Sequence, residues 1–231
     1  MRRMTNVVLM AGVLLAPVAF AAETGPAKAE AGETALTCGA PIAWDATEET
    51  LKSQFGAENV EYKDLGGPEG TEMFGTRVYG KDPKKTFDIV WSDEAKRANP
   101  SVINVNQVWS EDGETVTVPD WKSAEGIYLG MPIEELEKLN GKPFKLFGFG
   151  WDYGGSVISW EGGKLEPAAD AKCGVSVVLS DTAMDGTTCE LQGETEVMSD
   201  DKNMPKAKAQ VGRYSVYYVR EDVAEPASET P

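Results

Sequence analysis

Apolar residues recur three or four positions apart in two short stretches of this 231-residue chain. In residues 45–56, polar and acidic residues come first, Leu51 and Phe55 share one face, and a glycine ends the stretch. In residues 130–141, Pro132 precedes apolar residues that again share one face, and a glycine follows. A polar or proline start, amphipathic spacing and a terminal glycine are typical of short helices. We therefore predict one helix in each stretch.

Elsewhere the apolar residues alternate with polar ones, which is the spacing of β-strands. Residues 76–79 and 86–91, separated by a turn sequence, predict one hairpin. Residues 145–153 and 156–160, joined by a Gly-Gly pair, predict another. Many strands with few helices predict an α+β fold, in which short helices pack on an antiparallel sheet. The other predicted strands are residues 101–109, 115–118, 174–179 and 213–219.

Each predicted helix is followed by a hairpin that ends in a tryptophan, Trp91 in the first half and Trp160 in the second. A tandem duplication would produce this repeated plan, but few residues are identical, and coincidence explains it equally well. Residues 194–210 are charged without a clear period and predict a loop. The predicted organisation is a signal peptide at residues 1–21, a flexible linker at 22–36, a first α+β unit at 37–120, a second α+β unit at 121–220 and a disordered tail at 221–231.

Residues 147–153 carry an aromatic ring at every second position, with glycine or aspartate between the rings. In a strand, these rings would form a row on one face and leave the other face nearly bare. An exposed row would suit a partner, since Tyr and Trp combine a large rigid surface with a polar end. The row would equally serve as core beneath the second predicted helix. A third arrangement places Phe147 and Phe149 inside, with Trp151 and Tyr153 at the rim.

The N-terminus has the features of a secretory signal peptide. Arg2 and Arg3 precede an apolar run at residues 7–20, and small residues flank position 20. A glycine and a proline interrupt this run, which is shorter than the roughly 20 apolar residues that span a bilayer. We therefore predict cleavage after Ala21, a periplasmic or secreted mature protein, and no membrane span.

The chain is acidic, with 22 Lys and Arg against 38 Asp and Glu and a net charge of −16. Removal of residues 1–21 takes away two arginines and no acid, which leaves 20 against 38 and a charge of −18. Such a surface repels nucleic acid and attracts a basic partner, although it also serves solubility alone. The absence of histidine excludes Ser-His-Asp triads, other histidine general bases and histidine-ligated metals. No motif indicates a cofactor, a metal ion or catalytic residues.

Three cysteines in an exported chain suggest one disulfide and one free thiol. Cys173 and Cys189 flank a strand, a polar loop and a further strand, so they would meet across a hairpin. We predict a disulfide between these two residues. A bond from Cys38 to either of them is the alternative, and it would tie the first part of the chain to the second.

Residues 126–165 combine Gly-x-x-x-Gly-Met-Pro, a short predicted helix, Asn-Gly-Lys-Pro at residues 140–143 and an aromatic hairpin. This combination resembles the outer-membrane assembly lipoproteins of the SmpA/OmlA type and the secreted β-lactamase inhibitory proteins. The resemblance implies a helix packed on an antiparallel sheet. From the inhibitors it further implies two tandem units whose concave aromatic sheet face binds a protein. The residues before Cys38 form no lipobox, and the cysteine count differs from that of the inhibitors, so neither a lipid anchor nor a particular target is carried over.

We expect an exported protein that binds another protein or an envelope component through an aromatic sheet face. Inhibition of a basic hydrolase would be one form of this function. The alternatives are a structural role in envelope assembly and a carboxylate-based hydrolase of envelope glycans. The hydrolase would use Asp152 with a second acid such as Glu161, because paired carboxylates cleave glycosidic bonds without histidine. The predicted contact residues are Phe149, Trp151, Tyr153 and Trp160, followed by Trp91 and Tyr79.

Overall fold

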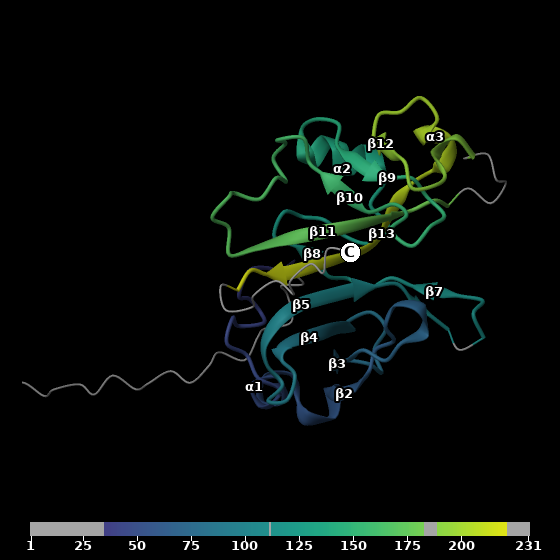
Figure 1. Ribbon diagram of the computed structural model, residues 1–231. Coiled ribbons are helices and arrows are strands. Elements are labelled where there is room, and N and C mark those ends of the chain that lie inside the picture. The colour runs from purple at the N-terminus through teal and green to yellow at the C-terminus, as the bar shows by residue number, and fades with distance from the viewer. Residues whose placement is uncertain (1–34, 111, 183–188, 221–231) are drawn as a thin grey trace, which may run out of the picture.

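The computed structural model describes residues 35–110, 112–182 and 189–220, and Figure 1 shows their arrangement. Short helices and mostly antiparallel strands make up these residues, which confirms the predicted α+β fold. The helices are α1 (Glu48–Phe55), α2 (Ile133–Asn140) and α3 (Met204–Ala207), and the 3₁₀ turns are η1 (Ala57–Asn59), η2 (Pro68–Gly70) and η3 (Cys189–Leu191). The strands are β1 (Ala35–Leu36), β2 (Val60–Asp64), β3 (Phe74–Val78), β4 (Phe87–Asp93), β5 (Ala98–Asn106), β6 (Val108–Trp109), β7 (Val116–Thr117), β8 (Lys122–Ser123), β9 (Lys145–Phe147), β10 (Val157–Ser159), β11 (Cys173–Ser180), β12 (Glu196–Met198) and β13 (Gln210–Tyr218).

Helix α1 lies where the spacing predicts it, begins at a capping box and ends at the predicted glycine. The Thr47 hydroxyl accepts a hydrogen bond from the Thr50 N–H at 3.2 Å, and the Thr50 hydroxyl accepts one from the Thr47 N–H at 2.9 Å. Gly56 follows with a φ of +91°, a conformation that favours glycine. The ring of Phe55 packs edge-on against Phe87 of β4, with 5.9 Å between the centroids. This contact places α1 on the sheet face that carries Phe87.

Helix α2 is also present where the spacing predicts it. Pro132 precedes it in an extended conformation, and Gly141 ends it in a left-handed conformation with a φ of +84°. Leu136 is fully buried. The Asn140 amide donates hydrogen bonds to the carbonyl oxygens of Lys142 and Trp160 at 2.9 and 3.0 Å. The end of α2 is thereby held to the strands that follow it.

A six-stranded antiparallel sheet, with strand order β11-β13-β5-β4-β3-β2, forms the centre of the fold. Strand β5 pairs with β13 from Asn106 opposite Arg213 to Val102 opposite Tyr217. Strands of both predicted units therefore share one sheet, and hydrogen bonds cross the predicted boundary at residue 120. The division of the chain into two units stays a prediction. The structure shows that strands from both predicted units pair within one sheet.

A second, three-stranded sheet has the order β10-β9-β12. It lies beside β11, because Ser156 forms a bridge with Val178, and the Leu179 N–H donates to the Gly155 carbonyl oxygen at 2.8 Å. In Figure 1, this sheet and α2 lie on one side of β11, while α1 and β2 to β5 form the opposite part of the molecule. Strand β12 and α3 lie within residues 194–210, so the loop predicted there is wrong. The β12 segment is a strand because it pairs with β9, a contact that local periodicity does not reveal.

The remaining strands form short pairs at the margins of the fold. Strand β1 runs parallel to β8, and β6 pairs with β7 in a hairpin that follows β5 (Figure 1). No helix in the three described ranges is long and apolar enough to cross a membrane. The predicted signal peptide, the tail at residues 221–231 and all but the last two residues of the predicted linker lie outside the described residues.

The two faces of the six-stranded sheet differ in polarity. On the inner face, Ile89, Ile103 and Val216 are cross-strand neighbours and belong to the buried core. Alternation along each strand puts the intervening residues on the outer face. The outer face is consequently polar at the level of the sheet centre. A row of polar residues crosses all six strands there in register: Glu61, Arg77, Asp88, Asn104, Ser215 and Ser176.

The disulfide joins Cys38 to Cys173, with 6.0 Å between the Cα atoms and a sequence separation of 135. The predicted bond between Cys173 and Cys189 is therefore wrong, and the alternative that ties the two parts of the chain together is the one that forms. Cys173 starts β11, which pairs with β13 rather than with a strand beside Cys189. The hairpin that would have brought Cys173 to Cys189 is thus replaced by a longer-range pairing.

Loss of the disulfide should destabilise the protein strongly. Removal of a native disulfide from a small exported domain typically lowers the free energy of unfolding by about 2–5 kcal/mol. We expect a loss of this size for Cys173→Ser, measured by urea unfolding. Peptide mapping without reductant should recover a linked pair of peptides that contain Cys38 and Cys173. Recovery of a Cys173–Cys189 link would contradict the assignment.

Tyr214 is fully buried in β13, and its hydroxyl finds no hydrogen-bond partner in the described part of the chain. Burial raises the pKa of this phenol far above its ordinary value. The folded state therefore keeps the proton at a pH where the unfolded state has lost it. As a result, the free energy of unfolding falls as the pH rises above about 10, the ordinary pKa of tyrosine.

Substitution of Tyr214 by Phe should remove both the buried hydroxyl without a partner and its effect on stability at high pH. Because a buried hydroxyl without a partner is unfavourable, we expect Tyr214→Phe to leave stability at neutral pH unchanged or to raise it by up to about 1 kcal/mol. The decline of stability above pH 10 should become weaker. Urea unfolding at neutral and alkaline pH measures both, with Tyr217→Phe on the same strand as the control. A loss of more than about 1 kcal/mol at neutral pH would mean that the hydroxyl has a favourable partner.

Candidate functional site

The segment predicted to form an aromatic row is a strand only as far as Phe147. Gly150 then takes a left-handed conformation with a φ of +89°. The chain turns there, and the Gly154 N–H donates to the Trp151 carbonyl oxygen at 2.7 Å. The predicted strand at residues 145–153 is therefore wrong beyond Phe147. The reason is that glycine lets the backbone leave the extended conformation.

The four rings divide between the core and the surface, as the third arrangement has it for every ring except Phe147, which is only half-buried. Phe149 is 4 % exposed, whereas Trp151 is 63 % and Tyr153 72 % exposed. Phe147 is half-buried, and its ring centroid lies 6.4 Å from that of Tyr153. The turn thus holds Phe149 inside and presents Trp151 and Tyr153 to the surroundings.

Close backbone contacts fix this turn in place. Gly155 has a φ of +76°, and a Cβ at this position would clash with the Leu179 carbonyl oxygen of β11. A Cβ at Gly148 would lie 2.6 Å from the Leu191 carbonyl oxygen and 2.7 Å from that of Gly193. Both glycines permit an approach that any side chain would prevent. The exposed rings therefore project from an anchored backbone.

A recess of about 230 Å³ lies beside these rings, and we call it the aromatic recess. Its apolar wall consists of Phe147, Trp151 and Tyr153. Glu194, which is exposed, contributes a carboxylate. Glycines complete the lining and leave space between the rings: Gly148, Gly154 and Gly193.

Three of the other predicted contact residues, Phe149, Trp91 and Trp160, belong to the buried core. The Trp91 indole N–H, for example, donates to the Thr76 hydroxyl at 2.9 Å. Tyr79 is half-buried and packs against the core. Their burial removes the first three from any contact surface, because a large aromatic residue serves the core as readily as a partner.

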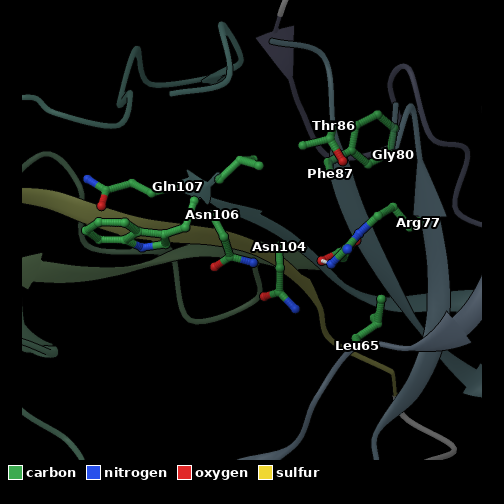
Figure 2. Close-up of a pocket in the computed structure, with 11 residues that line it drawn as sticks. Leu65, Arg77, Gly80, Thr86, Phe87, Asn104, Asn106 and Gln107 are labelled. Atoms are coloured by element: carbon green, nitrogen blue, oxygen red, sulfur yellow. Dashed lines mark hydrogen bonds and ion pairs between the residues drawn. The ribbon is translucent and has the colours of Figure 1, made fainter. Parts of the chain in front are cut away.

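A second cavity of about 360 Å³ lies over the polar outer face of the six-stranded sheet, and we call it the sheet-face cleft (Figure 2). Residues from β3, β4, β5 and β6 meet there, although Arg77 of β3 and Trp109 of β6 are 32 positions apart in sequence. Antiparallel pairing brings them together, because it aligns alternate residues of neighbouring strands on one face. Its principal side chains are those of Arg77, Thr86, Asp88, Asn104, Asn106 and Trp109.

An ion pair and a hydrogen bond hold the polar groups of the cleft. Arg77 donates to both carboxylate oxygens of Asp88, from Nε at 2.7 Å and from Nη2 at 2.9 Å. The hydrogen bond to Asp88 raises the pKa of the Arg77 guanidinium above its ordinary value. On β5, Asn104 Oδ1 accepts a hydrogen bond from the Ser215 hydroxyl of β13 at 2.7 Å. These groups are thereby oriented before any ligand arrives.

Trp109 reaches the cleft from the β6–β7 hairpin and is 61 % exposed. The sequence predicts the strands around it but indicates no function for this residue. A usable signal was present: Asn104 and Asn106 occupy alternate positions of one strand and indicate a polar face that leads to Trp109. Tryptophan next to such a face is a candidate contact residue.

The two carboxylates of the hydrolase hypothesis line neither cavity. Asp152 and Glu161 are exposed. Glu161 Oε1 accepts a hydrogen bond from the Ser159 hydroxyl at 2.7 Å and lies 3.9 Å from Lys145 Nζ. In the part of the chain that the structure describes, no group of acidic or cysteine side chains is arranged to hold a metal ion. The two acids therefore share neither the aromatic recess nor the sheet-face cleft.

No protein-family model, curated protein or solved structure matches this chain. The resemblance of residues 126–165 to envelope lipoproteins and secreted inhibitors therefore stays a prediction. The aromatic recess and the sheet-face cleft are the features of the molecule that bear on its function.

The anchoring of the aromatic turn can be tested at Gly155. Gly155→Ala introduces both a left-handed alanine and a clash with β11, whereas Gly113→Ala, at a φ of +72° with open space around it, introduces only the former. A left-handed residue other than glycine costs about 1–2 kcal/mol. We expect Gly155→Ala to lose a further 1–3 kcal/mol, roughly the cost of overpacking. Urea unfolding measures the difference, and equal losses in the two variants would show that the turn does not pack closely on β11.

Proposed function

We propose that this chain is an exported binding protein that contacts a basic partner protein through the aromatic recess. The observation that carries the proposal is the exposure of Trp151 and Tyr153, at 63 % and 72 %, on a turn fixed by its backbone contacts. Large aromatic side chains on a rigid backbone suit protein recognition, because they bury much surface and lose little conformational entropy.

The chemistry of the aromatic recess favours a positively charged group. The faces of Phe147, Trp151 and Tyr153 carry negative electrostatic potential, and Glu194 adds a carboxylate. A Lys ammonium or an Arg guanidinium over such a face gains roughly 0.5–2 kcal/mol. The volume of about 230 Å³ suits one such side chain rather than a larger ligand.

The charge of the whole chain favours the same partner. The net charge is −16 over the full sequence. An acidic surface attracts a basic protein over several ångströms and raises the association rate, an effect that salt screens. The acidic surface would first attract the basic partner, and the recess would then bind one of its cationic side chains.

Export rests on two features. The N-terminal residues have the pattern of a cleavable signal peptide. The disulfide between Cys38 and Cys173 suits an oxidising compartment such as the periplasm or the cell exterior. The partner is therefore expected among envelope or extracellular proteins, where a basic hydrolase is one candidate.

Affinity capture with matched variants tests the proposal. The chain without its predicted signal peptide is immobilised and exposed to an envelope extract from its source organism. We expect basic proteins to be retained by the wild type and reduced at least ten-fold with Trp151→Ala/Tyr153→Ala, since two hot-spot residues contribute more than about 1.4 kcal/mol. Quantitative mass spectrometry of the captured proteins gives the ratio.

The controls separate the recess from general electrostatics. Trp151→Ala/Tyr153→Ala keeps the net charge, so charge attraction alone would leave its capture unchanged. Trp109→Ala removes a tryptophan of similar exposure, 61 %, from a different cavity and should capture the same proteins as the wild type. Equal capture by the wild type and the double variant would contradict the proposal. Retention of outer-membrane assembly proteins by both would favour a structural role instead.

A further inference from the structure

We propose that the sheet-face cleft is a second binding site and that its ligand is an uncharged carbohydrate. No residue lines both this cleft and the aromatic recess, so the two sites are distinct. Thr86 lines the cleft and is only 9 % exposed, yet its hydroxyl has no hydrogen-bond partner among the described residues. An unpaired buried hydroxyl costs about 1–3 kcal/mol. A ligand hydroxyl bound beside Thr86 would offset this cost.

Thr86 belongs to the same polar surface as the rest of the cleft. It lies directly before β4 and lines the cleft together with Asp88 and Asn106. Figure 2 shows Thr86, Asn104 and Asn106 among the residues that line the cleft. The unpaired hydroxyl is therefore one member of a group of polar side chains and not an isolated defect.

The cleft offers donors and acceptors in the pattern that a sugar requires. The side-chain amides of Asn106 and Gln107 make no hydrogen bond within the described chain. Each of them has a donor and an acceptor end. Asn104 accepts from Ser215 at 2.7 Å, which leaves its NH₂ group free to donate. Each sugar hydroxyl both donates and accepts, so it pairs with either end of an amide. Planar amides of this kind, of which Asn104 is oriented by Ser215, favour a polyhydroxylated ligand over an apolar one.

Trp109 adds the apolar surface that distinguishes a sugar from water or an ion. Its indole is 61 % exposed on the β6–β7 hairpin beside the polar groups. A pyranose ring has one face rich in C–H groups, and this face packs on an aromatic ring while the hydroxyls point outward to polar partners. An indole next to free amides provides for both parts of such a ligand.

The charges of the cleft select an uncharged ligand. Arg77 and Asp88, the two charged residues of the lining, neutralise each other at 2.7 and 2.9 Å. The cleft thus has no net charge, although the chain carries −16. Neither a cation nor an anion finds an unpaired opposite charge there. The volume of about 360 Å³ is at the lower end of the roughly 300–1,000 Å³ typical of small-molecule sites and suits one or two sugar rings.

Calorimetric titration with defined oligosaccharides tests the proposal. The neutral probes are the tetramers of N-acetylglucosamine, β-1,4-glucose and α-1,4-glucose, and the anionic comparison is tetragalacturonate. We expect at least one neutral probe to bind with a Kd in the micromolar to millimolar range, and tetragalacturonate to bind at least ten-fold more weakly. The absence of binding by every neutral probe at millimolar concentration would overturn the proposal, as would tighter binding of the anion.

Variants then place the binding in the cleft. Thr86→Val replaces the hydroxyl with a methyl group of the same shape. We expect it to bind the neutral probe several-fold more weakly while its stability stays equal or rises, a combination that a structural role for the hydroxyl would not produce. Trp109→Ala should weaken binding at least ten-fold. Trp151→Ala/Tyr153→Ala should bind like the wild type, so failure here is distinguishable from failure of the proposed protein contact. Wild-type affinity in both Thr86→Val and Trp109→Ala would overturn the assignment.

Discussion

The pairing of β5 with β13 is the interaction on which both cavities depend. Strand β5 carries Asn104 and Asn106 into the sheet-face cleft and leads directly into the hairpin of Trp109. Strand β13 pairs with β11, and β11 receives the aromatic turn through the contact between Gly155 and Leu179. One continuous sheet therefore supports the cleft in one part and the aromatic recess in another. The disulfide adds a covalent tie between the N-terminal segment and β11.

The separation of the two sites follows from the same architecture. The inner face of the sheet is closed by the core and by α1, so neither site uses it. The outer face remains polar because Arg77, Asp88, Asn104 and Ser215 satisfy one another in register. The aromatic recess lies outside the six-stranded sheet, on a turn of the smaller one. If both proposals hold, the protein can keep a glycan and a basic protein on different surfaces at the same time.

The parts of the fold that sequence alone predicts are those that local signals determine. Helices α1 and α2 have their start signals, a capping box and Pro132 respectively, and their terminal glycines within one short window, and most strands show clear alternation. The order of strands is different, because β5 and β13 are about one hundred residues apart and nothing local selects their pairing. The disulfide shares this difficulty. The spacing of the three cysteines favours a bond between Cys173 and Cys189 across a hairpin. Because β11 pairs with β13 instead, Cys173 bonds to Cys38.

The aromatic segment shows a second limit of periodicity. Alternating aromatics separated by Gly148 and Gly150 fit a strand, yet the same glycines permit a turn, so the pattern does not decide between them. Exposure of Trp151 and Tyr153 was among the predicted arrangements, whereas burial of Trp91 and Trp160 depended on tertiary packing. The unpaired hydroxyl of Thr86 has no signature in sequence, because a missing partner is a property of three-dimensional surroundings.

Native-state hydrogen exchange of the β5 and β13 amides tests most directly whether one sheet unites the chain. If the two strands are parts of one cooperative unit, the amides of Val105 and Tyr214 exchange only through global unfolding. Their protection free energies should then be equal and should fall with the same dependence on urea. Exchange of one strand at a clearly lower free energy, while the other stays protected, would show that the two halves unfold independently and would contradict the account.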